Sequence, residues 1–198
     1  MRKQLNWRYV CEDDIPIIKD SYNELMEYCF AQSVFVSFSD VWYGGKKQES
    51  FMRQLSNYHV ATIQTRRWCY MDFSRMDFSI EPNQGFVVVY IYKSCDDVKN
   101  IIKEHTDNLF FLTFTDDGNL GINPYMLEDL CFFRNNKVLL STSTHDFRCT
   151  IYPESDEEIA LFKKILLLEK SIASINICDV DAASDIDLAS FNIGGLLK

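Results

Sequence analysis

Two apolar segments, residues 86–92 and 109–114, constrain the fold of this chain more than any other feature of its sequence. Phe86–Tyr92 (FVVVYIY) and Leu109–Phe114 (LFFLTF) lack the alternation of apolar and polar residues found in a strand with one face in water. Strands without that alternation are typically buried on both faces. We therefore predict that both segments are central strands, in a sheet that is covered on both sides.

Local patterns place the remaining elements. An acidic pair before Pro16, the Asn123–Pro124 pair and a Ser155/Glu158 capping box are typical helix starts. With the apolar spacing that follows such signals, we predict helices over about 14–30, 46–57, 95–105, 123–135 and 155–175. Other β-rich or alternating segments predict strands over 33–38, 59–65, 138–143 and 147–152. The apolar phase switches near Ser74–Arg75, which predicts a bulge or tight turn.

The order of these elements defines the fold class. Strands and helices do not alternate as they do in repeated βαβ units, so we predict an α+β fold. Its central sheet would be mixed or mainly antiparallel, with flanking helices. A chain of 198 residues with 47% apolar residues is long enough for one core and small for two. We expect a single domain over 1–178, followed by a loosely held tail over 179–198 that is acidic and then apolar.

Charge restricts the partners. The formal net charge is −9, which repels a nucleic-acid backbone and favours a basic protein partner. The longest aliphatic stretch, near Ile165–Leu168, is too short to span a membrane, and no apolar run follows the charges at the N-terminus. We therefore expect a cytoplasmic protein that binds neither nucleic acid nor membrane.

Cysteine and histidine spacing gives no sign of a metal or cofactor. The seven cysteines are odd in number and include no Cys-x-x-Cys pair, so we predict reduced thiols and no disulfide. The three histidines are about forty residues apart, without the spacing of a helical metal site. We expect neither a bound metal nor a cofactor. The cysteines are Cys11, Cys29, Cys69, Cys95, Cys131, Cys149 and Cys178.

The most enzyme-like group is His145–Asp146 with Cys149 nearby. A cysteine nucleophile needs a base within hydrogen-bonding reach and a group that orients the base. Adjacent residues of a strand point to opposite faces, so His145 and Asp146 would not converge. Cys149 alternates with Phe147 and Ile151 on an apolar face. These residues therefore favour a structural or turn role over catalysis.

Candidate partner-binding residues are of two kinds. Aromatic and arginine residues dominate the energetics of protein interfaces, and Trp42, Tyr43, Arg67 and Trp68 are the candidate anchors. The alternative for the second pair is an edge strand whose arginines block aggregation and whose Trp68 lies in the core.

Acidic residues near strand ends are the second kind. Loops at strand ends present side chains outward from a rigid scaffold, where charge accelerates association. The candidates are Asp116, Asp117, Glu154 and Asp156. The alternative is that these acids cap helices and keep the protein soluble.

Residues 109–162 carry one resemblance. A buried strand with an acidic turn (LFFLTFTDDG) precedes a strand pair with a His-Asp turn (LLSTSTHDFRCTIY) and an acid-capped helix (ESDEEIALF). This order resembles the C-terminal half of bacterial polymorphic-toxin immunity proteins. The resemblance implies a stoichiometric inhibitor that masks a cognate toxin, often a basic nuclease.

Two further hypotheses stay open beside a non-catalytic, immunity-type binding protein. One is a small cytosolic enzyme whose site is assembled from distant residues. The other is a subunit of a larger assembly. A deep pocket with converging polar groups and shifted pKa values would favour the enzyme.

Overall fold

The computed structural model describes residues 3–8, 19–40, 48–68, 71–72, 87–114, 120–135, 137–167 and 176–179. The helices are α1 (Lys19–Gln32), α2 (Glu49–Leu55), α3 (Asp96–His105) and α4 (Asp156–Leu167), with a 3₁₀ turn at Ser56–Tyr58. The strands are β1 (Lys3–Arg8), β2 (Phe35–Asp40), β3 (His59–Thr65), β4 (Arg67–Trp68), β5 (Met71–Asp72), β6 (Val87–Lys93), β7 (Leu112–Phe114), β8 (Leu120–Ile122), β9 (Glu128–Arg134), β10 (Lys137–Ser143), β11 (Arg148–Ile151) and β12 (Asn176–Asp179).

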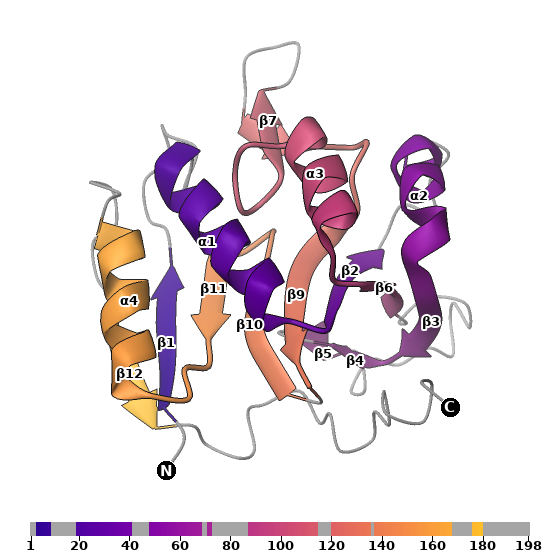
Figure 1. Cartoon of the computed structure of the whole chain (residues 1–198). Helices are drawn as coiled ribbons and strands as arrows, with labels where there is room; N and C mark the ends of the chain where they lie inside the picture. Colours follow the sequence, from indigo (N-terminus) through magenta and orange to yellow (C-terminus); the bar gives the residue numbers. More distant parts are fainter. Residues whose placement is uncertain are drawn as a thin grey trace.

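One sheet of eight strands organises the molecule, in the order β12-β1-β11-β10-β9-β2-β6-β3 (Figure 1). Each pair of neighbours in it is antiparallel. The first strand lies between two late ones, because Leu5 pairs with both Ile151 and Ile177. Two short hairpins, β4–β5 and β7–β8, lie outside the sheet. The predicted α+β class is confirmed, with an antiparallel sheet.

The described helices all cover one face of the sheet (Figure 1). Along β2, Val36 and Phe38 belong to the helix-side core, whereas Phe35 belongs to a second apolar cluster. Successive strand residues point to opposite faces, so this second cluster lies on the face away from the helices. Trp68 of β4 packs there against Phe133. The central strands are thus buried on both sides, as the sequence predicted for β6.

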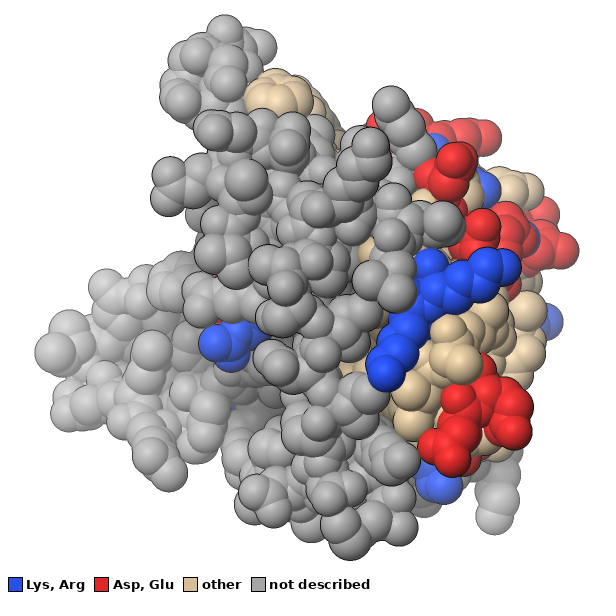
Figure 2. Space-filling model, turned by 90° about the vertical axis from the view of Figure 1, so that its left-hand side faces the viewer, with Lys and Arg blue, Asp and Glu red and all other residues tan. Residues whose placement is uncertain are grey.

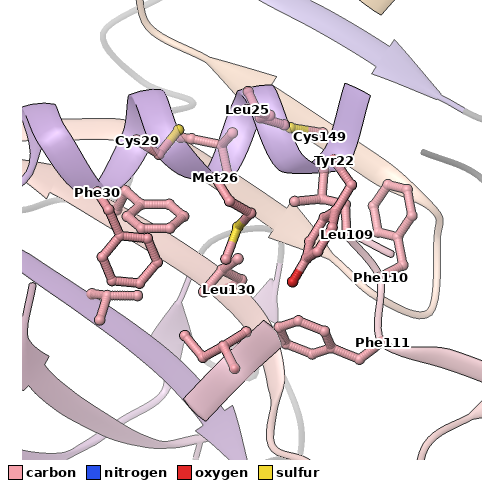
Figure 3. Close-up of a cluster of buried hydrophobic side chains, with 14 of the residues drawn as sticks. Tyr22, Leu25, Met26, Cys29, Phe30, Leu109, Phe110, Phe111, Leu130 and Cys149 are labelled. Carbon is pink, nitrogen blue, oxygen red and sulfur yellow. The ribbon is translucent and has the colours of Figure 1, made fainter. Parts of the chain in front are cut away.

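The helix-side core is built around α1 (Figure 3). Tyr22, Leu25, Met26 and Cys29 recur at three- and four-residue steps and face the sheet, where all four are buried. They meet Leu130 of β9 and three consecutive buried residues that precede β7, Leu109, Phe110 and Phe111. Several rings contact edge to face, which adds to the free energy gained from their burial.

The predicted helix over 123–135 is wrong. Asn123 begins a turn, in which its side-chain Oδ1 accepts a hydrogen bond from the Tyr125 N–H (3.0 Å). The chain then enters β9, between β2 and β10. This strand is buried on both faces, so its apolar residues are consecutive and imitate helical spacing. At the expected helix end, Arg134 of β9 instead pairs with Lys137 of the antiparallel strand β10.

The predicted central strand over 109–114 is also wrong. Leu109–Phe111 are buried but irregular, and Phe111 has a positive φ of 55°. Only Leu112–Phe114 form a strand, β7, and it pairs with β8 outside the main sheet. The cause is a bend at Asn108, whose side-chain amide donates to the Leu112 carbonyl (2.9 Å) and accepts from the Leu112 N–H (2.8 Å).

Most other predicted elements are confirmed. They include the strands at β2, β3, β10 and β11 and the helices at α2 and α3. α1 runs from Lys19 to Gln32 and α4 from Asp156 to Leu167. The remaining parts of these two predicted helices, the predicted bulge near Ser74–Arg75 and tail residues 180–198 lie outside the described residues. β12 ends at Asp179, so the boundary expected after 178 falls within this strand.

Candidate functional site

Among the four predicted anchors, the structure describes the side chain of Trp68. Trp42 and Tyr43 lie outside the described residues, and for Arg67 only the backbone pairing with Asp72 is described. Trp68 is 1% exposed and packs on Phe133 (ring centroids 6.1 Å apart). A partner could not reach this ring without displacing the residues that bury it. The structure therefore corrects the assignment of Trp68 as an exposed anchor.

Glu154 and Asp156 are exposed at the start of α4, but Glu154 also has a structural role. Its carboxylate lies 3.1 Å from Arg134 Nη1 and 3.8 Å from Lys137 Nζ. A charge that is already paired attracts a distant partner less, because the field of its neighbour opposes its own. Asp116 and Asp117 lie outside the described residues, so their proposed role rests on their sequence position between β7 and β8.

Glu158, the acid of the predicted capping box, joins α4 to the sheet. The Glu158 N–H donates to Ser155 Oγ (3.2 Å), which confirms one half of the box. Its carboxylate accepts from the Glu154 N–H (2.6 Å), from both terminal nitrogens of Arg134 and from the Tyr28 hydroxyl. Burial alone would raise the pKa of Glu158, but these hydrogen bonds outweigh it and hold the pKa below its usual value.

Of the three enzyme-like residues, two are exposed in a turn and the third is buried in the core. His145 and Asp146 lie in the β10–β11 turn, where the Ser143 hydroxyl donates to Asp146 Oδ2 (3.2 Å). Cys149 lies in the helix-side core with Phe147 and Ile151, as predicted. Burial raises the pKa of the Cys149 thiol well above its usual value. A thiol held in its protonated form is a poor nucleophile, so this group is not an activated cysteine.

The different burial of the cysteines predicts how fast each one is alkylated. Cys29, Cys95, Cys131 and Cys149 are free thiols, and only Cys95 is partly accessible. We expect iodoacetamide to label Cys95 in the native protein at least tenfold faster than Cys29 or Cys149, and all four after denaturation in urea, because the thiolate is the reactive form. Peptide mapping by mass spectrometry identifies each site. Rapid native labelling of Cys149 would contradict the placement of this residue in the core.

A buried pair of acids that the sequence analysis overlooked lies beside His145. Between β2 and β9 the register shifts, because Ser37 faces Cys131 while Ser39 faces Glu128, which leaves one extra residue in β9. Asp129, at this bulge, has a positive φ of 49°, a conformation that aspartate tolerates better than most residues. The sequence signal for this buried acid pair was the presence of two consecutive acids inside the apolar run MLEDLCFF.

Asp129 joins β9 to β2 and to the β10–β11 turn. Its Oδ2 accepts from the Ser39 hydroxyl (2.8 Å) and its Oδ1 from the Thr144 N–H (2.8 Å). The Asp129 N–H donates in return to Thr144 Oγ1 (3.1 Å). Burial raises the pKa of Asp129 to about 6, although both hydrogen bonds to the carboxylate act in the opposite direction.

Glu128 forms an ion pair with His145 at the surface end of the same cluster. His145 Nε2 lies 2.9 Å from Glu128 Oε2, with the histidine side chain 49% exposed and the glutamate 4%. The hydrogen bond to Glu128 is the main cause of a raised His145 pKa, and burial opposes it. The pair holds the β10–β11 turn against the start of β9. Within the described part of the chain, no three His, Cys, Asp or Glu side chains are placed to hold a metal ion.

Two exposed aromatic residues on the β7–β8 unit were also missed. Phe114, at the outer end of β7, and Tyr125, in the turn after β8, are each 59% exposed. Figure 1 shows β7 at the top of the view, beside the upper end of α3. The wrong prediction of a central strand over 109–114 led to Phe114 being missed, because a central strand would have buried this side chain. Isolated exposed apolar residues are common, so the meaning of these two depends on their setting.

Charge is mixed on the side of the molecule next to α4 and β12. Figure 2 shows acidic and basic side chains interleaved on its described part, with a basic group between two acidic ones. Such a surface has a weaker field than its acid count alone suggests. None of the described helices is long and apolar enough to cross a membrane.

Comparison with known proteins gives no match, since no family model, curated protein or solved structure is significantly similar to the chain.

Proposed function

We propose that this protein is a non-catalytic binding protein of the immunity type, which holds a basic protein partner in a stoichiometric complex. The observation that carries the proposal is the exposure of two aromatic side chains, Phe114 at the outer end of β7 and Tyr125 in the turn after β8. Large aromatic side chains in water are the groups that gain most from burial against a partner. The net charge of −9 favours a basic surface as that partner.

The candidate partner is the protein encoded by the neighbouring reading frame, because immunity proteins are encoded beside their toxins. The two chains are expressed together, with the partner inactivated if it is toxic. We expect a one-to-one complex by sedimentation, and loss of the partner's toxicity when this protein is present. A partner that stays free at micromolar concentrations of both chains would contradict the proposal.

Neutralising acidic side chains tests the same proposal through the rate of association. A variant with Asp116→Asn, Asp117→Asn and Asp156→Asn should associate about tenfold more slowly at low salt and dissociate at the wild-type rate. Glu154 is left unchanged because Arg134 holds it. Wild-type association at low salt would remove these acids from the interface.

One observation favours a small enzyme as the alternative. Asp129 combines a raised pKa with a positive φ beside the Glu128–His145 pair, and such features gather at catalytic sites. The same features also occur in structural networks. The alternative gains if His145→Ala removes a measurable turnover while the fold and its unfolding midpoint are retained.

A further inference from the structure

The turn between β10 and β11, Thr144–Phe147, is held to β9 by side chains. The register partners of β9 and β10 nearest to this turn are Cys131 and Ser141. Beyond them, the carboxylate of Asp129 accepts from the Thr144 N–H (2.8 Å), and the Asp129 N–H donates to Thr144 Oγ1 (3.1 Å). Contacts with a titratable side chain thus take the place of backbone pairing at this end of the sheet.

Two adjacent acids of β9, Glu128 and Asp129, are buried beside the turn, and each is 3% exposed. The ion pair described for these acids joins Glu128 to His145 of the turn, at 2.9 Å. A buried acid that loses its partner cation costs free energy. Histidine is the side chain that ordinarily loses its charge near neutral pH. The charge balance of this buried pair therefore depends on the protonation of His145.

The charges around His145 favour its protonated form. The groups that shift its pKa are all acidic, and they are Glu128, Asp129 and Asp146. Three further charged residues belong to the segments next to the turn: Asp40 ends β2, Arg148 begins β11, and Asp107 precedes the buried residues before β7. Arg148 is exposed and keeps its charge throughout the range in which histidine titrates. His145 is thus the group of the turn that changes charge near neutral pH.

The closed turn also stores backbone strain. Phe147 has a positive φ of 49°, in the left-handed region that a bulky residue rarely adopts. Its ring packs on Phe110, and Phe111 beside it has a positive φ of 55°. Strain of this kind persists only where the surrounding contacts impose it. Weakening one of those contacts therefore favours release of the turn.

We propose that the β10–β11 turn is a pH-sensitive switch, which the charged Glu128–His145 pair holds against β9 and which opens locally when His145 releases its proton to solvent. Opening exposes Glu128 and Asp129 to water. This switch goes beyond the proposed function and does not depend on it, because the protein alone carries every group involved.

Linkage gives the direction of the switch. The pKa of His145 is raised in the folded protein, so the closed turn binds the proton more tightly than the open turn does. The closed form is therefore favoured at lower pH and loses that advantage as the pH rises above the usual histidine value of 6.5. Burial raises the pKa of Asp129 to about 6, so this carboxyl is mostly ionised where His145 titrates and adds a second buried negative charge.

Hydrogen exchange of the Thr144 amide measures opening of the turn. This amide is buried and bonded to Asp129, so it exchanges with solvent when the turn leaves β9. Rates are measured by NMR at about pH 6 and about pH 8.5, on either side of the histidine range, and each is divided by the intrinsic rate at that pH. We expect the protection of Thr144 to fall by about fivefold or more, because a hydrogen bond between charged groups is stronger than one to a neutral group. Protected amides of β2 should keep their protection, and the midpoint of the fall should match the titration of the His145 ring in the same spectra.

Two conservative variants and one matched control assign the effect. His145→Gln and Glu128→Gln each keep a hydrogen-bonding group but remove one charge of the pair, so protection of Thr144 should be low and equal at both pH values. His59→Gln is the control, because His59 is also exposed but is bonded to the neutral hydroxyl of Thr62 (2.8 Å). This variant should retain the wild-type pH dependence. Unfolding midpoints show that each protein is folded, and His145→Gln alone decides the question if Glu128→Gln does not fold.

Three results would overturn the switch. One is equal protection of Thr144 at both pH values in the wild-type protein. A second is a fall in protection that persists in His145→Gln, because another group would then cause it. The third is a fall that the β2 amides share, since this would report loss of global stability in place of local opening. None of these results bears on the proposed function, which is tested by binding of the partner.

Discussion

Replacing Asp129 by Ala is expected to lower the free energy of unfolding by about 2–4 kcal/mol at pH 7. The Ala side chain leaves the Ser39 hydroxyl and the Thr144 N–H without their buried acceptor. It also places a residue with a Cβ and no polar group at a positive φ. Urea unfolding followed by tryptophan fluorescence gives the midpoint. Asp146→Ala is the control, because Asp146 is exposed and should cost less than about 1 kcal/mol.

Asp129→Asn separates the hydrogen bonds from the charge. The amide retains an acceptor for Thr144, and Asn also tolerates a positive φ. A carboxyl whose folded pKa lies near 6, above its unfolded value near 4, binds its proton more tightly in the folded state. Wild type therefore loses stability as the pH rises from about 4 to 6, and Asp129→Asn should lack this loss.

The pH profile is read as a difference between the two proteins. We expect Asp129→Asn to be as stable as wild type or more stable at pH 7, and the advantage to vanish near pH 4. The pKa of His145 is raised above its usual value of 6.5. In both proteins, the stability contributed by the charged form of His145 is therefore lost only as the pH rises above 6.5. A difference that does not change between pH 4 and 6 would show that Asp129 titrates normally.

Glu158→Ala is expected to lower the free energy of unfolding by about 2–4 kcal/mol, because it leaves the partly buried Arg134 side chain without the carboxylate that accepts two of its hydrogen bonds. The two side chains are only 13% and 14% exposed, and Glu158 also serves Tyr28 and the Glu154 N–H. The folded pKa of Glu158 is lowered, so its contribution is present above about pH 4.5 and lost as the pH falls through that lowered value.

A double-mutant cycle measures this pairing directly. Arg134→Ala, Glu158→Ala and the double variant should give a coupling free energy of about 1–3 kcal/mol in urea unfolding at pH 7. Asp156→Ala, in the same first turn of α4 but exposed, is the matched control for loss of an acid near the helix dipole. Additive effects of the two single changes would mean that the ion pair adds nothing beyond its separate contacts.

The sequence predicted elements best where polarity varies along them. α3 and β3 have clear apolar faces, and their bounds were found to within a residue or two. β9 was taken for a helix because burial on both faces removes the period by which a strand is identified. The prediction for the segment before β7 was wrong for another reason. Its three buried residues follow a bend set by one side chain, Asn108, which composition does not reveal.

The candidate site was predicted only in part. The turn role of His145 and the core position of Cys149 followed from strand alternation, and both agree with the structure. Glu128 was missed because its partner His145 is distant in sequence and joins it through pairing of β9 with β10. Phe114 was missed because exposure depends on where a strand ends relative to the core. Neither relation is visible in the local sequence.

The position of β1 has a consequence for synthesis of the protein on the ribosome. Leu5 pairs with Ile151 and Ile177, so the first strand emerges long before either neighbour exists. At usual elongation rates the nascent β1 waits roughly ten to thirty seconds for them. During that time its backbone groups have no strand partner and are open to chaperones or to mispairing. The pairing of β1 with β11 and β12 is thus a late step, completed after translation. Destabilised variants should therefore aggregate during synthesis before they do so as finished chains.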